Sequence, residues 1–472
     1  MFVPSNPFSI IPTGRGLRWS ILLFCTLLAG CAASRPVADA PPLTADALSR
    51  PGQVEGHIEV WSWNIAAKAL QQLTPTFRRQ YPRIDPNVDM TGANMQARLL
   101  LSLASNVGAP DVMQLQCEEA PHYLCTGKLA DLTAVAAGFQ KDFPASLWHN
   151  CVYKGRVYAI PWDMGPCAIY YKRNIFQQYG IDPDKIETWD DFIAAGQEIL
   201  QKSHGQTKML PMDTGALATM YQLLIQQNGG QVFDDNGRIA VNSPQSRQAL
   251  GVLRRMLQAG ICSNVKMWGQ EFMAGLNNDT IATYPEAAWF AGTIKDAAPD
   301  YGGKRQIWGI FRLPALVKGG LRTSNLGGSV LVIPQQCRNK PAAWAFLRYA
   351  LCTAEGQLAM YRSENLFPAY LPALRSPVFD EPDPFFGGQQ IGRLFAGDAA
   401  KMNILNRTAD WMEALGYLNQ TFSKWADEGM TDTEALAELE QKLHRRLGVE
   451  IAPSSPSRTA HRTRARQSHD EA

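Results

Sequence analysis

The stretch PWDMGPCAIYYKRNIF spans residues 161–176 and sets an indole and a carboxylate at a bend in the chain. Trp162 and Asp163 directly follow Pro161, and proline interrupts regular structure. The run CAIYYK that comes next is rich in strand-forming residues, and RNIF is typical of the start of a helix. An aromatic ring and an acid at such a bend need an explanation from the rest of the chain.

Length and composition indicate an ordinary globular protein of more than one lobe. The 472 residues are about three times the usual domain size. With 46% hydrophobic residues and a net charge of +2, the chain has no global field that would gather nucleic acid, so we expect no such partner. We also expect the protein to be a monomer. Twelve tryptophans are more than a core of this size needs, and some are therefore expected to contact a ligand.

The amino terminus predicts export and a lipid anchor. Arg15 and Arg18 precede the apolar run SILLFCTLLAG, which is too short to span a membrane, so residues 1–30 are predicted to be a signal peptide. Leu-Ala-Gly before Cys31 resembles a bacterial lipobox, in which the cysteine is acylated and becomes the first mature residue. Simple secretion with an incidental cysteine remains the alternative.

Two further segments lack an apolar period. Residues 31–55 are rich in Ala, Pro and polar residues and predict a flexible tether, and residues 451–472 predict a disordered basic tail. Seven cysteines remain beyond Cys25 and Cys31, and the odd number leaves at least one unpaired. Their pairing stays open, buried free thiols being the simplest reading, and none has zinc-site spacing: Cys117, Cys125, Cys151, Cys167, Cys262, Cys337 and Cys352.

Between these segments, alternating strands and helices predict an α/β fold. GHIEVWSWN reads as a strand that ends at Trp63 and Asn64, and AAKALQQLTPTFRRQYPRI reads as a helix that Pro75 should kink or restart. PDVMQLQ then reads as a buried strand, which makes a strand–helix–strand unit with a parallel sheet. Helix starts are predicted at Thr188 with Asp191, at Ser243 with Pro244 and at Thr431 with Glu434.

The order of ten motifs resembles the extracellular solute-binding proteins of bacterial ABC importers, in the carbohydrate-binding branch that includes the maltose-binding proteins. The resemblance covers about residues 56–450, and no single motif is diagnostic. The motifs, in order, are IEVWSWN, FRRQYP, GAPDVMQLQ, GKLADLT, YAIPWDMGPCAIYYKRNIF, TWDDF, ATYPEAAWF, WGIFRLPAL, NLGGSVLVIP and KPAAWAFLRYA.

This resemblance implies a type II periplasmic-binding-protein-like fold, in which hinge crossovers join two α/β lobes around a ligand cleft. The N-terminal lobe would comprise residues 56–165 and 310–367, and the C-terminal lobe residues 166–309 and 368–450. The first crossover would be IPWDMGP, so that Trp162 and Asp163 lie at the base of the cleft; the second would fall near GIFRLP and the third near Phe367 to Pro372.

Sugar chemistry then suggests which residues would bind a ligand in that cleft. The apolar face of a pyranose stacks on aromatic rings, while its hydroxyls need carboxylates, amides and backbone groups. Some of the candidates could instead have purely structural roles. Asp163 could cap the following turn, Trp289 could be a core residue, and Gly327 with Gly328 could serve the turn alone. The predicted ligand-binding residues are Trp63, Asn64, Glu118, Trp162, Asp163, Tyr221, Trp268, Glu286, Trp289, Gly327, Gly328 and Phe386.

The resemblance implies a non-catalytic protein that captures a di- or oligosaccharide and delivers it to a membrane permease, with no cofactor. A secreted glycoside hydrolase is the alternative, because it too needs tryptophans and two carboxyl groups about 5–10 Å apart. Asp163 and Glu286 would be that pair. Maltose- or trehalose-type glucosides, lactose and arabinose-containing sugars all remain open as the ligand.

Overall fold

The computed structural model describes residues 43, 54–91, 95–298, 307–399 and 401–453, and all of them belong to one compact unit, Leu43–Ala472. The predicted signal peptide, Cys31 and residues 454–472 lie outside the described residues. No helix within the described ranges has the length and apolar character needed to cross a membrane.

A five-stranded sheet, in the order β2-β1-β3-β12-β6, organises the first lobe, called lobe 1 below. Strands β1 (Gly56–Ser62), β2 (Ile84–Met90) and β3 (Val112–Gln116) are parallel, as the strand–helix–strand pattern predicts. The sheet is nevertheless mixed, because β12 (Ser329–Val332) pairs antiparallel with both β3 and β6 (Ala159–Pro161). Strand β12 returns from the other lobe and therefore enters from the opposite end.

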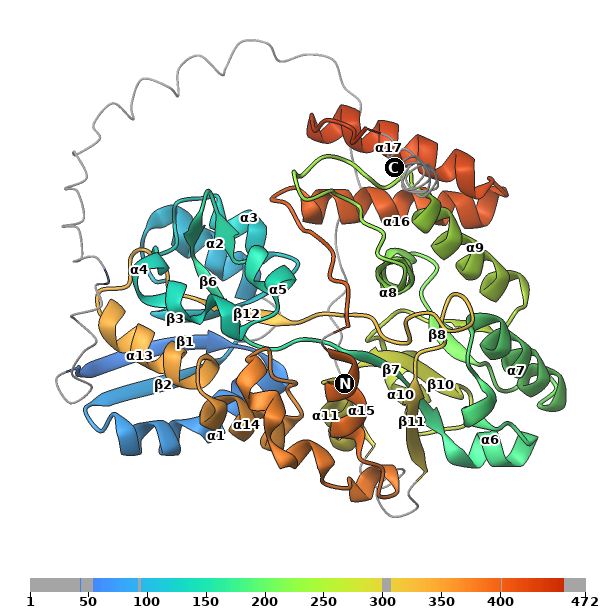
Figure 1. Cartoon of the computed structure of the whole chain (residues 1–472), viewed down its shortest axis with the longest axis horizontal. Helices are drawn as coiled ribbons and strands as arrows, with labels where there is room; N and C mark the ends of the chain where they lie inside the picture. Colours follow the sequence, from blue (N-terminus) through green and yellow to red (C-terminus); the bar gives the residue numbers. More distant parts are fainter. Residues whose placement is uncertain (1–42, 44–53, 92–94, 299–306, 400, 454–472) are drawn as a thin grey trace, which may run out of the picture. The chain divides into compact units, whose positions relative to one another are not determined.

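Helices α1 (Asn64–Gln80), α13 (Lys340–Leu351) and α14 (Ala354–Glu364) pack together beside β1 and β2 (Figure 1). Helix α1 remains one helix although Pro75 lies inside it, so the predicted restart does not occur. Pro75 is exposed, and water can therefore solvate the carbonyl that its missing N–H leaves unpaired. The remaining helices of this lobe are α2 (Met95–Ser105), α3 (Ala120–Leu124), α4 (Thr133–Ala136) and α5 (Ala145–His149), and a short hairpin joins β4 (Val152–Tyr153) to β5 (Arg156–Val157).

A second, antiparallel sheet in the order β10-β7-β11 organises lobe 2. It contains β7 (Cys167–Lys172), β10 (Thr283–Ala287) and β11 (Trp308–Arg312), and a parallel pair, β8 (Leu210–Met212) and β9 (Cys262–Asn264), lies beside β10. Its helices are α6 (Arg173–Tyr179), α7 (Trp189–Lys202), α8 (Ala218–Gln227), α9 (Pro244–Gln258), α10 (Gln270–Gly275), α11 (Phe290–Ala297), α16 (Trp411–Glu428) and α17 (Asp432–Leu447). Helix α15 (Ile391–Ala399) precedes α16.

The three predicted helix starts are confirmed. Thr188 and Asp191 form a capping box at α7, and Thr431 and Glu434 form one at α17. The Ser243 side chain accepts a hydrogen bond from the backbone of Ser246 at the start of α9. These motifs are local, because a cap satisfies N–H groups only three residues away.

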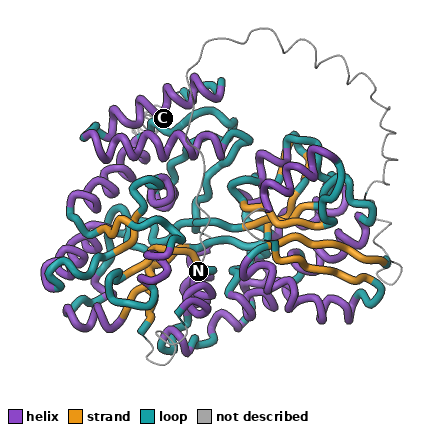
Figure 2. The backbone as a smooth tube through the Cα atoms, turned by 180° about the vertical axis from the view of Figure 1, so that it is seen from behind, coloured by secondary structure: helices purple, strands orange, loops and turns teal. Residues whose placement is uncertain are grey.

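Three segments connect the two lobes, and they lie side by side (Figure 2). The first joins β6 to β7, as predicted. The second follows β11 and leads into β12, so the predicted lobe boundary at 309/310 falls inside β11, whose whole length pairs with β7. The third follows α14 and contains Phe367 and Pro368, and it pairs with the first. The backbone nitrogen of Met164 donates to the Phe367 carbonyl at 3.0 Å, and Asp163 forms a bridge with Pro368.

The structure corrects both ends of the predicted body. Leu43 and Val54, assigned to the tether, are buried in the core, and Ile451, assigned to the tail, forms a parallel bridge with Ile239. All seven cysteines beyond Cys31 are free thiols; five are buried, Cys262 is half-buried and Cys125 is exposed.

Candidate ligand-binding site

A cavity of about 720 Å³ lies between the lobes and brings together most of the predicted ligand-binding residues. The predicted residues that line it are Trp63, Asn64, Asp163, Trp268, Trp289, Gly327 and Gly328. The other lining residues are Ile65, Ala66, Lys68, Met90, Gln114, Gln116, Thr293, Asp296, Ser329 and Leu366. Its size suits a small organic ligand.

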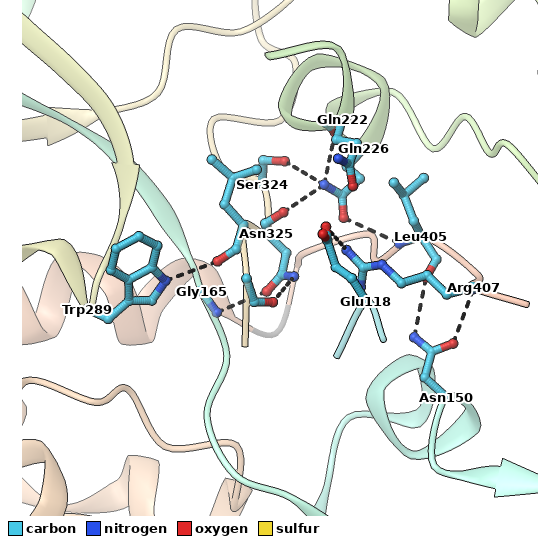
Figure 3. Close-up of polar contacts among 12 residues, drawn as sticks. Glu118, Asn150, Gly165, Gln222, Gln226, Trp289, Ser324, Asn325, Leu405 and Arg407 are labelled. Atoms are coloured by element: carbon cyan, nitrogen blue, oxygen red, sulfur yellow. Dashed lines mark hydrogen bonds and ion pairs between the residues drawn. The ribbon is translucent and has the colours of Figure 1, made fainter. Parts of the chain in front are cut away.

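Lobe 2 contributes a pair of tryptophans. The rings of Trp268 and Trp289 are 5.6 Å apart between centroids and tilted by 36°. Trp268 has a positive φ of 64°, a backbone conformation that bulky residues rarely adopt, and the residue is 49% exposed. The indole nitrogen of Trp289 donates to the Leu326 carbonyl at 3.2 Å, which fixes this ring beside the second crossover (Figure 3).

Lobe 1 contributes Trp63 and Asn64, which lie where β1 ends and α1 begins. Asn64 has a φ of 50°, so this wall of the cavity also carries a left-handed residue. The buried side chain of Gln114 accepts a hydrogen bond from Ser62 at 2.6 Å and donates to the Ser329 hydroxyl at 2.8 Å. This amide therefore ties together the ends of β1, β3 and β12 beneath the cavity.

Asp163 lies at the base of the cavity and is bound to the neighbouring crossover. Its Oδ1 accepts a hydrogen bond of 2.8 Å from the backbone nitrogen of Ser329. Burial raises the pKa of this carboxyl to about 7, against the lowering effect of the Ser329 hydrogen bonds. The carboxyl of Asp163 therefore binds the Ser329 backbone across the crossovers and does not cap the turn that follows it.

The glycine pair at Gly327 and Gly328 follows from close packing. A Cβ on Gly328 would lie 2.9 Å from the Asp163 carbonyl oxygen, and one on Gly327 would lie 3.3 Å from the Trp289 indole nitrogen. Both residues also have positive φ. Only glycine lets the second crossover approach the cavity base this closely.

Charged side chains that the sequence analysis missed lie at the cavity wall. Lys68 of α1 is 3.4 Å from Asp296 of α11 and 3.3 Å from the buried Glu364 of α14. Lys68 is four residues after Asn64 and hence on the same helix face, a signal that a helical projection from Asn64 would have found. Asp296 carries no such signal, because it reaches the cavity only through the packing of the lobes.

Glu286 lines a separate, smaller cavity of about 40 Å³ in lobe 2, together with Met212, Met220 and Leu326. Burial raises the pKa of its carboxyl to about 8. No residue lines both this cavity and the larger one, so Asp163 and Glu286 do not face a common space. This arrangement lends no support to their use as the paired carboxyl groups of a hydrolase.

Four predicted residues do not line either cavity. Trp162 and Phe386 are buried in the same hydrophobic core as the lobe 1 sheet. Tyr221 is buried in the core of lobe 2, where its hydroxyl donates to Ser246. Glu118 instead pairs with Arg407. Of the four, only Tyr221 lies in an α-helix, and Trp162 and Glu118 lie in loops that follow β6 and β3, so no local period shows which way they face. For the three aromatic residues, side-chain type alone did not distinguish core from cleft.

No cluster of three or more candidate metal ligands occurs within the described ranges. The described lining of the large cavity combines three tryptophans with amides, hydroxyls and the buried carboxyl of Asp163, and Lys68 and Asp296 add an ion pair at its wall. Such walls can hold a polar, uncharged molecule that has an apolar face.

Residues 82–384 match the family model of the bacterial extracellular solute-binding proteins. The chain belongs to this family. Membership places the protein in the periplasm or outside the cell, and it accounts for a cavity between two lobes.

The relatives of this solute-binding protein agree with that assignment. It is 24% identical to an arabinooligosaccharide-binding protein of Halalkalibacterium halodurans, over 75% of this chain and 81% of the relative. It is 26% identical to a lactose-binding protein of Rhizobium radiobacter, over 74% and 84%. A binding protein of B. animalis subsp. lactis, solved in complex with β-1,6-galactobiose, matches 84% of this chain and 100% of its own with a TM-score of 0.71 and 24% identity. These likenesses confirm the predicted type II periplasmic-binding fold.

Proposed function

We propose that this solute-binding protein captures a neutral di- or oligosaccharide in the 720 Å³ cavity and delivers it to an ABC permease. The observation that carries the proposal is that Trp63 of lobe 1 and the ring pair of Trp268 and Trp289 in lobe 2 line one cavity together with polar groups. Aromatic faces suit the C–H face of a pyranose, and the amides of Gln114 and Gln116 suit its hydroxyls.

The charges around the cavity favour an uncharged ligand. Among the described residues that line the cavity, the cation is Lys68, and it is paired with Asp296 and Glu364 and so is not free to hold an anionic sugar. Burial raises the pKa of the Asp163 carboxyl to about 7, which favours the neutral form relative to an exposed aspartate; a protonated carboxyl can both donate to and accept from hydroxyls.

Support for the ligand class also comes from relatives. The two curated proteins named above bind arabinooligosaccharides and lactose, and the solved structure holds a galactobiose. We extend from them only the class of ligand, since the identities are 24% and 26%.

We further propose that acylation of Cys31 anchors the protein to a membrane, because Leu28, Ala29 and Gly30 precede it as in a lipobox. The anchor would keep the binding protein near its permease, and a monomer would suffice for transport. Enzymatic activity has no part in this proposal.

The decisive experiment is calorimetric titration of the purified protein with arabinotriose, lactose, β-1,6-galactobiose and maltose, with galacturonate and lysine as charged controls. We expect at least one neutral sugar to bind and both controls to fail. A folded protein that binds a charged control, and none of a broad neutral sugar panel, would overturn the proposal.

A further inference from the structure

A seam of polar contacts joins lobe 1 to the segment between α15 and α16 (Figure 3), and the residues that form it, Glu118, Asn150, Leu405 and Arg407, do not line the large cavity. On lobe 1, Asn150 follows α5, and its side chain donates to the Leu405 carbonyl and accepts from the Arg407 backbone, both at 3.3 Å. Glu118, just after β3, accepts from the Arg407 guanidinium at 3.2 Å. Helix α16 also contacts α3.

The same segment is tied to lobe 2 on its other side. The backbone nitrogen of Leu405 donates to the Gln226 side chain of α8 at 3.3 Å, and Gln226 donates to the Asn325 carbonyl of the second crossover at 2.7 Å. Asn403 donates to the Gln226 carbonyl at 2.8 Å. Movement of lobe 2 would therefore carry Arg407 with it, away from Glu118.

Arg407 is poorly satisfied in this position. Its side chain is 1% exposed, whereas that of Glu118 is 20% exposed. Its Nη2 binds Glu118, but its Nε and Nη1 are buried and have no acceptor within the part of the chain that the structure describes. The guanidinium carbon lies over the Trp411 ring, 5.4 Å from its centroid.

Two opposing effects follow from this geometry. Burial of a guanidinium with unpaired N–H groups is unfavourable, and separation of the lobes would let water reach them. The charge of Glu118 offsets that cost only while the lobes touch, since the pair bridges them. The balance between the two makes the contact sensitive to a single charge.

We propose that Arg407 is a positioning residue whose ion pair with Glu118 latches the two lobes together in the absence of ligand. The latch would set the separation of the lobes. Through that separation it would also set the affinity of the cavity for a sugar, and this effect on affinity rests on the function proposed above. Because the latch already holds the lobes partly closed, a ligand has to supply less of the closure and binds more tightly.

The test is solution scattering of the full-length mature protein without any sugar. Glu118→Gln leaves a buried charge without a counter-charge, so we expect the radius of gyration to rise. The double variant Glu118→Gln with Arg407→Met removes both charges and should return the radius toward that of the wild type. Asn150→Ala, which removes only neutral hydrogen bonds, should give a smaller increase.

A matched control is Asp432→Asn, which breaks the pair of Arg254 with Asp432 inside lobe 2, where the N···O distance is 2.7 Å. We expect it to lower the melting temperature and leave the radius unchanged. If Glu118→Gln behaves like this control, the pair is only structural and the latch is wrong.

A second measurement links the latch to the cavity. Using whichever sugar of the panel binds, Glu118→Gln should raise the Kd by roughly tenfold, chiefly through faster dissociation. The scattering result stands alone if no sugar binds, so failure of the ligand proposal and failure of the latch are distinguishable. An increased radius with unchanged Kd would overturn the link to affinity.

Discussion

The Asp163 carboxylate accepts a hydrogen bond of 2.8 Å from the backbone nitrogen of Ser329, and this contact joins the first crossover to the first residue of β12. The backbone nitrogen of Trp162 also donates to the Ser329 carbonyl, at 2.8 Å. Two segments that pass between the lobes are thus connected at the base of the cavity. A residue predicted to bind ligand also holds the hinge.

This double role gives a prediction for Asp163→Asn and Asp163→Ala. The amide oxygen of Asn can still accept from Ser329, so Asn should cost about 1 kcal/mol or less of unfolding free energy, whereas Ala leaves a buried N–H unpaired and should cost about 1–3 kcal/mol. If the carboxyl also binds a sugar hydroxyl, Asn should weaken sugar binding by roughly 1–3 kcal/mol. Denaturant unfolding and calorimetry on the same samples separate the two effects. Unchanged affinity in the Asn variant would leave Asp163 with the structural role alone.

Trp268 should matter for binding and hardly at all for stability. Its ring is about half exposed, so Trp268→Ala should change the unfolding free energy by about 1 kcal/mol or less, and relief from the positive φ is small because Ala is strained there too. Loss of the stacking face should weaken sugar affinity by roughly 1–3 kcal/mol. Trp268→Phe is the matched control, because it retains a smaller stacking face. Equal affinity in all three proteins would exclude Trp268 from the site.

The close approach of the second crossover can be tested at Gly328. Ala at this position combines a φ of 96° with a Cβ 2.9 Å from the Asp163 carbonyl oxygen. Gly388 has a φ of 80° but no atom within 4 Å of its Cβ position, so Gly388→Ala measures the backbone cost alone. We expect Gly328→Ala to lose about 1–3 kcal/mol more than this control in urea unfolding. Equal losses would mean that the crossover can move aside.

Stability should depend on pH through the buried carboxyls. Burial raises the pKa of Asp163 to about 7 and that of Glu286 to about 8, above ordinary values of 3.8 and 4.5. A carboxyl whose pKa is higher in the folded than in the unfolded protein contributes its full stabilisation at pH values below the unfolded pKa. This contribution is lost as pH rises through the folded pKa. The unfolding free energy should therefore fall between about pH 4 and pH 8 from this cause. Lys172, whose pKa burial lowers to about 7, acts in the opposite direction above that pH.

The Glu286 contribution is isolated by subtraction. The difference in unfolding free energy between wild type and Glu286→Gln, measured by urea titration at pH 5, 6, 7 and 8, cancels the effect of Lys172. We expect this difference to favour the variant increasingly as pH rises. A constant difference would show that Glu286 does not titrate in this range.

Membrane anchoring is tested at Cys31, which lies outside the described residues. Because Leu28, Ala29 and Gly30 precede it, Cys31→Ala should abolish labelling by a fatty acid and release soluble protein. Cys25→Ala, in the same segment, is the matched control and should keep the label. Equal labelling of wild type and Cys31→Ala would contradict acylation there.

The sequence by itself predicted the strand–helix–strand unit at the start of the body and three helix starts, but it missed the continuity of α1 through Pro75 and the lobe boundary at β11. Thr188 with Asp191 and Thr431 with Glu434 predicted helix starts correctly, because a cap depends on residues three positions apart. The bend at Trp162 and Asp163 was correctly predicted as a crossover, since its motif order resembled a known family. Trp162 nevertheless lies in the core, because the face that a ring presents depends on what packs against it.

Only the tertiary structure decided which side chains share the cavity and the seam. Lys68 and Asp296 meet across 228 residues, and Glu118 and Arg407 meet across 289. Local patterns report contacts within a helical turn or along a strand, and they carry no information on which loops face each other after the chain has crossed three times between lobes. Long-range pairs of this kind form only when the lobes pack, and the packing therefore decides both the ligand cavity and the polar contacts that bridge its two sides.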